Sequence, residues 1–65
     1  TQPTAMLAAD IAAETDAIRG YEQMLCKLTN PTLSALISRI VLDEQLHLRC
    51  FKDMYCELMN NAENN

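Results

Sequence analysis

Leu28-Thr29-Asn30-Pro31-Thr32 decides the fold, because a helical pattern stops and starts again at this interior segment. Asn30 is a favourable N-cap, and Pro31 suits the first turn of a helix, where a backbone N–H is not needed. The proline also pushes the residue before it out of helical geometry, which ends the preceding helix. The sequence therefore predicts one helix over about 4–28, a turn over 29–31 and a second helix over about 31–60.

Two long helices joined by so short a turn form an antiparallel hairpin. The chain has 65 residues, 49% of them hydrophobic, with one Gly and two Pro, and this composition favours a single all-α domain over 1–65. A chain of this length buries only about 60% of its unfolded surface, so it generally needs a partner, a metal or disulfides. We expect two hairpins to dimerise into a four-helix bundle.

Apolar residues recur on one face of each helix, as amphipathic helices require. They are Leu7, Ile11, Ile18, Tyr21, Leu25 and Leu28 in the first helix, and Leu33, Ile37, Ile40, Val41, Leu48, Phe51, Tyr55 and Leu58 in the second. Glu14 lies at the centre of the first stripe and Glu44 at the centre of the second, with His47 at its edge. An ionised carboxylate among apolar side chains is unfavourable unless it is paired or binds a metal.

The spacing of these three residues brings them to one level. Glu14 lies 14 residues before Leu28 and Glu44 lies 13 residues after Pro31, so each is about 20 Å from the turn at 1.5 Å per residue. Residues three apart on a helix are neighbours, which lets Glu44 and His47 reach one site. A second hairpin doubles the set to the di-metal pattern of ferritin-like bundles, in which two helices each give a Glu and two give Glu-x-x-His.

Two segments resemble the metal-binding helices of the rubrerythrin branch of the ferritin-like superfamily. They are residues 14–22, in which Tyr21 follows Glu14 by seven positions, and residues 40–47, which contain Asp43-Glu44-x-x-His47. The resemblance extends over about 9–57. It implies that Glu14, Glu44 and His47 of two chains are the metal-binding and catalytic residues, and that Tyr21 lies beside the metals.

The same resemblance implies the cofactor and the partners. Full-length members carry four helices in one chain, whereas this chain has two, as in encapsulated ferritins. We therefore expect a homodimer or a higher homo-oligomer with two iron ions per dimer, manganese and zinc being the alternatives. A protein shell is a further candidate partner. The implied activity is oxidation of Fe(II) by O2 or peroxide, in iron handling or peroxide detoxification.

Other polar residues near the ligands keep two interpretations. Asp10 and Asp43 are candidates to orient His47 through its second ring nitrogen, as metal-binding histidines generally require, or they are surface charges. Tyr21 either contacts a ligand carboxylate or packs in the core with its hydroxyl hydrogen-bonded.

Apolar and sulfur-containing residues off the site have simpler interpretations. The methionines Met6, Met24, Met54 and Met59 are expected to fill the core. Leu42 and Leu46 are predicted to point outward, where they offer a contact between bundles.

Charge and cysteine content limit the surroundings of the protein. A net charge of −4 and five scattered basic residues argue against nucleic acid and anionic membranes as partners, and no apolar run is long enough to span a membrane. The cysteines Cys26, Cys50 and Cys56 are read as thiols of a reducing cytoplasm, inside a protein compartment if a shell is present. The alternative function is a metal-free helical hairpin that dimerises as an interaction module, and a third is a structural zinc or manganese site without turnover.

Overall fold

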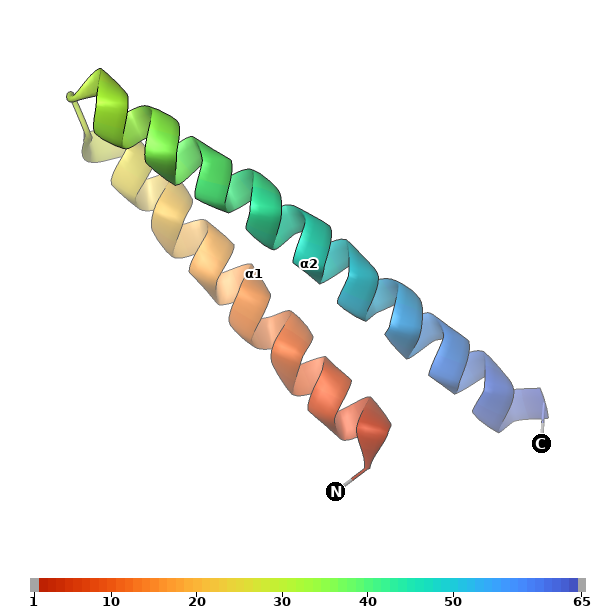
Figure 1. Ribbon diagram of the computed structural model, residues 1–65. Coiled ribbons are helices and arrows are strands. Elements are labelled where there is room, and N and C mark those ends of the chain that lie inside the picture. The colour runs from red at the N-terminus through yellow and green to blue at the C-terminus, as the bar shows by residue number, and fades with distance from the viewer. Residues whose placement is uncertain (1, 65) are drawn as a thin grey trace.

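The chain folds into two antiparallel helices that lie side by side (Figure 1). The structure is a computed structural model that describes residues 2–64, with side chains described for residues 2–61. Helix α1 comprises Pro3–Lys27 and helix α2 comprises Pro31–Asn64. The molecule measures 53 × 16 × 15 Å, and both free ends lie away from the turn. The all-helical hairpin predicted from the sequence is confirmed.

The turn between the helices is stabilised as the Asn-Pro pair predicts. The backbone N–H groups of Thr32 and Leu33 donate to Asn30 Oδ1 at 2.9 and 3.1 Å, which caps the start of α2. At the end of α1, Leu28 adopts an extended conformation while its N–H still donates to the Met24 carbonyl at 3.1 Å. Three residues, 28–30, are therefore enough to reverse the chain.

Helix α2 is longer than the sequence indicated. It continues to Asn64, whereas the predicted end was near residue 60. Residues 58–64 contain neither Gly nor Pro, so no residue there interrupts a helix. The second helix consequently extends past the beginning of α1, as Figure 1 shows.

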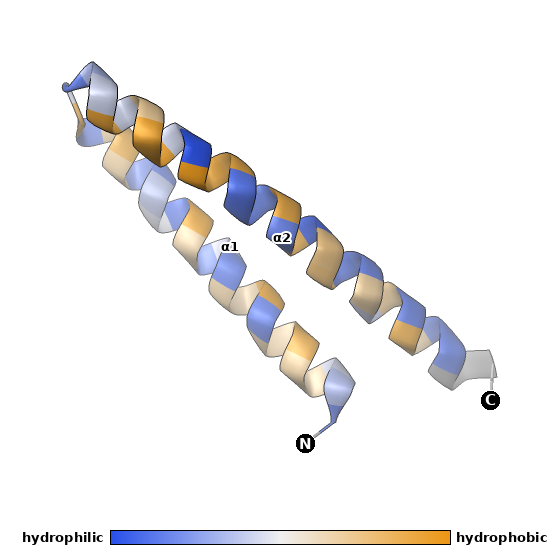
Figure 2. Ribbon diagram, in the orientation of Figure 1, coloured by the Kyte–Doolittle hydropathy of each residue, from blue (hydrophilic) through white to orange (hydrophobic). Residues whose placement is uncertain are grey.

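The core of the single hairpin is small. Among the described residues only Ile18 and Val41 are buried, each with 8% of its surface exposed. Most other members of the two predicted stripes are half-buried between the helices: Leu7, Ile11, Tyr21, Leu25, Leu28, Ile37, Leu48, Phe51, Tyr55 and Leu58. Figure 2 shows hydrophobic residues along the length of both helices. One hairpin thus covers only part of its apolar surface.

Several apolar residues expected inside lie on the surface of the hairpin. Leu33 and Ile40 are 48% and 37% exposed, because the side of α2 that carries them has no helix against it. The four methionines expected to fill the core are exposed as well. Leu42 and Leu46 point outward as predicted.

Two further features concern the environment of the chain. Within the part of the chain that the structure describes, neither helix holds a stretch with the length and hydropathy needed to cross a membrane. Cys26, Cys50 and Cys56 are exposed free thiols.

Candidate metal centre

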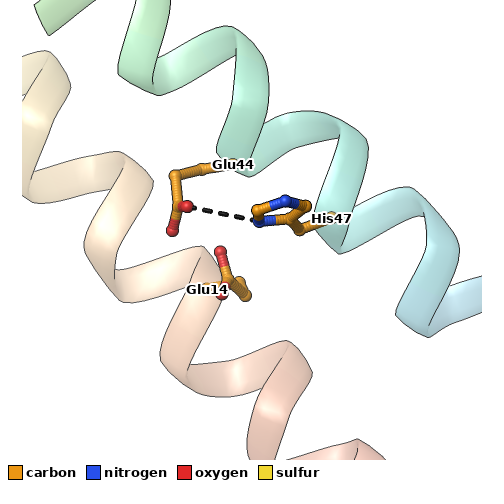
Figure 3. A group of neighbouring side chains, drawn as sticks. All are labelled: Glu14, Glu44 and His47. Carbon is orange, nitrogen blue, oxygen red and sulfur yellow. Dashed lines mark ion pairs between the residues drawn. The ribbon is translucent and has the colours of Figure 1, made fainter.

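Glu14 of α1 and Glu44 and His47 of α2 come together near the middle of the hairpin. Figure 3 shows the three side chains pointing toward one another in the space between the helices. Each offers one ligand atom, and these atoms lie within 4.8 Å of one another. The convergence predicted from the equal distances to the turn is therefore present in the structure.

The Glu14 carboxyl group has an unsatisfied oxygen. Among the described residues, Glu14 Oε2 is the buried side-chain oxygen or nitrogen atom that lacks a hydrogen-bond partner. Buried polar atoms are nearly always paired, and leaving one unpaired is unfavourable. A cation held between Glu14 and Glu44 would satisfy this oxygen.

The electrostatic surroundings of Glu14 disfavour its ionised form. A hydrogen bond between the Glu14 and Glu44 carboxyl groups is the largest cause of a raised pKa for Glu14, followed by burial and the negative charge of Glu44. The charge of Asp10 raises this pKa further, while His47 lowers it. Two ionised carboxyl groups so close repel each other, and a proton or a cation between them would relieve this repulsion.

His47 forms the rim of the cluster. Its Nδ1 lies 3.4 Å from Glu44 Oε1, so this nitrogen is turned toward the carboxylates (Figure 3). The side chain of His47 is 60% exposed, compared with 22% for Glu44. The site is consequently covered on the side of the two helices and open on the side of the imidazole.

The structure separates the other residues that the sequence singled out. The carboxylate of Asp43 lies 3.6 Å from Arg39 Nε, one helical turn away, so it is engaged in a surface ion pair. Asp10 is exposed and acts on the site through its charge. Tyr21 is half-buried and lies seven residues from Glu14, about 10 Å along the helix. Neither Asp10 nor Asp43 belongs to the group of converging ligand atoms.

Sequence reasoning missed one neighbour of the carboxylates. Thr15 follows Glu14 and is part-buried, but its hydroxyl donates to the Ile11 carbonyl at 2.7 Å. This hydroxyl is therefore already hydrogen-bonded within its helix and is a poor candidate for a metal ligand. The four-residue spacing of Ile11 and Thr15 is the sequence signal for this bond.

The donor set has a defined chemical preference. Two carboxylates and one imidazole suit iron, manganese and zinc, whereas copper(I) prefers the sulfur of Cys or Met.

Comparison with protein-family models, curated proteins and solved structures found no match for this chain.

Proposed function

We propose that this chain is half of a di-metal carboxylate protein of the ferritin-like, rubrerythrin type, with its site formed between two copies. The observation that carries the proposal is the convergence of Glu14, Glu44 and His47 around an unsatisfied, buried Glu14 oxygen. Among the described residues, one hairpin brings three candidate ligand residues together, and these are Glu14, Glu44 and His47. A second copy supplies the matching three, and the pair would hold two ions, iron being the favoured metal.

The residues of the chain have distinct parts in this proposal. Glu44 would hold the ions from the middle of the cluster, and Glu14 and His47 would be their further ligands from the same chain. Metal binding requires ionised carboxylates, so it competes with the protonation that the raised pKa of Glu14 favours. When bound, two ferrous ions would supply the two electrons that reduce O2 to hydrogen peroxide, or peroxide to water.

The experiment that tests this function is aerobic addition of Fe(II) to metal-free protein. The wild-type chain should develop ferric absorbance faster than buffer alone, and Glu44→Ala should reduce the rate to that of buffer. Glu57→Ala is the matched control, since Glu57 is an exposed glutamate of the same helix outside the cluster. Equal rates for wild type and Glu44→Ala would contradict the proposal.

One observation also favours the metal-free interaction module. The Glu14 and Glu44 carboxyl groups lie close together and their interaction raises the pKa of Glu14, so a proton could take the place of a cation between them. The metal content of protein purified without chelator distinguishes the two functions. The di-metal protein should carry about one ion per chain, whereas the interaction module should carry none. Full occupancy without iron oxidation would instead identify a structural zinc or manganese site.

We propose a cytoplasmic setting for this function, because exposed thiols such as Cys26, Cys50 and Cys56 stay reduced there. Enclosure in a protein shell extends the same proposal.

A further inference from the structure

Most exposed apolar side chains of helix α2 belong to two separate sets, and Met59, near the free end, belongs to neither. The first set lies on the same side of α2 as His47. Together with two exposed methionines of α1 we call it the open face, and it consists of Met6, Met24, Leu33, Leu36, Ile40 and Met54. The other set, called the outer ridge, consists of Leu42 and Leu46. A completed site needs a second copy, and these two surfaces are the apolar candidates for its docking.

The position of each set relative to Glu44 follows from the helix repeat. At 3.6 residues per turn, the buried Val41 lies about 60° to one side of Glu44. Leu36 and Met54 lie about 80° to the other side, with His47 between them and Glu44. Leu42 and Leu46 lie about 160° from Glu44, on the back of the helix. The open face therefore borders the ligands, and the outer ridge does not.

Helix α1 has the same arrangement. Its buried residue, Ile18, lies about 40° to one side of Glu14, and the exposed Met6 and Met24 lie about 80° to the other side. In both helices the exposed residues are rotated from the glutamate in the same sense. Because the two right-handed helices run in opposite directions, residues rotated in the same sense lie on the same side of the hairpin. The open-face residues of α1 and α2 thus lie on one side of the hairpin, the side on which His47 is exposed.

We infer that a second copy of this chain docks on the open face, so that its own glutamates and histidine reach the site from the side on which His47 is exposed. This inference rests on the proposed function and adds the surface that completes it. Each of the six apolar residues would lose exposed area in the same step that closes the metal centre.

The outer ridge has a different character. Its two leucines line an open groove with Arg39, Asp43, Gln45 and Arg49, so charged and polar groups surround them. A copy docked there would lie across α2 from Glu44 and could bring no ligand to the half-formed site. Docking on this ridge leaves the ligand set at three residues per centre.

Leu36 and Leu42 provide a matched pair for the test. Both are leucines of α2 and both are 57% exposed, so the change to Glu adds the same charge at the same exposure on the two surfaces. The mass in solution and the binding of Zn²⁺ to metal-free protein would be measured for each variant, with circular dichroism as the check that the helices remain. We expect Leu36→Glu to shift the dimer toward the monomer and to weaken Zn²⁺ binding at least tenfold, while Leu42→Glu matches wild type.

Met24→Glu repeats the test from α1, in case Leu36→Glu loses helical structure; its expected result is the same as for Leu36→Glu. If Leu42→Glu, and neither open-face variant, dissociates the dimer, the docking surface is wrong although the metal function stands. Wild-type protein that binds Zn²⁺ while it remains a monomer also overturns the inference. Wild-type protein that binds neither Zn²⁺ nor Fe(II) overturns the proposed function itself.

Discussion

Adding Zn²⁺ to metal-free protein should raise its melting temperature strongly. The hairpin buries only Ile18 and Val41 among its described residues, so a bound ion would add a large share of the total stability. Free Zn²⁺ at one hundred times the dissociation constant stabilises a one-site protein by about 2.7 kcal/mol. For a domain of this size 1 kcal/mol shifts the midpoint by about 4–8 °C, so the expected increase is roughly 10–20 °C.

The assay is thermal unfolding followed by circular dichroism at 222 nm, with Zn²⁺ chosen because it undergoes no redox reaction. Glu44→Gln keeps the shape of the side chain and removes its charge, so the variant should lose most of the increase. Glu57→Gln removes the same charge from an exposed position outside the cluster and should keep it. A wild-type increase that survives in Glu44→Gln would refute the assignment of the ion to this cluster.

Two further predictions concern protein without metal. The raised pKa of Glu14 means that protonation of this group stabilises the folded state. This contribution to stability is fully present below the ordinary pKa near 4.5 and is lost as the pH rises through the raised pKa. The free energy of unfolding in urea should therefore be equal for Glu14→Gln and wild type at pH 4, and higher for Glu14→Gln at pH 7. The same difference between the two proteins at both pH values would contradict this. Asn30→Ala removes the cap of α2 and should cost about 0.5–2 kcal/mol in the same assay, whereas Asn60→Ala, within α2, should cost little.

The hairpin could be predicted from the sequence because its signals are local. Asn30 and Pro31 determine the turn through one side-chain cap and one missing N–H, and both effects act within a few residues. The meeting of Glu14 and Glu44 could also be predicted, since it needs only the helix rise and the position of the turn.

The covered and uncovered sides of each stripe could not be predicted in the same way. Leu33 and Ile40 have the apolar character of core residues and the correct helical spacing, yet they are exposed in the hairpin. A helical repeat gives the direction of a side chain relative to its own helix, but not which part of the stripe faces the second helix. That depends on how the two helices pack, which the turn residues do not specify.

The Arg39–Asp43 pair shows a related limit. Asp43 precedes Glu44 and was a candidate to orient His47, but the structure places its carboxylate beside Arg39. The four-residue spacing of Arg39 and Asp43 is itself a sequence signal for a surface ion pair. Both interpretations are compatible with the residue types, and only the geometry distinguishes them.

The equal spacing of Glu14 and Glu44 from the turn constrains how this chain can change in length. Inserting one residue between Glu14 and Lys27 would rotate Glu14 by about 100° and remove it from the cluster. Inserting seven residues would restore the face but shift the carboxyl group by about 10 Å along the axis. Insertions between the glutamates and the turn keep the ligands together only if both helices change by the same amount. Additions before Asp10 or after Cys56 leave the ligands in place. Homologous chains are therefore expected to vary in length at their free ends and to keep the number of residues between the two glutamates constant, apart from paired changes.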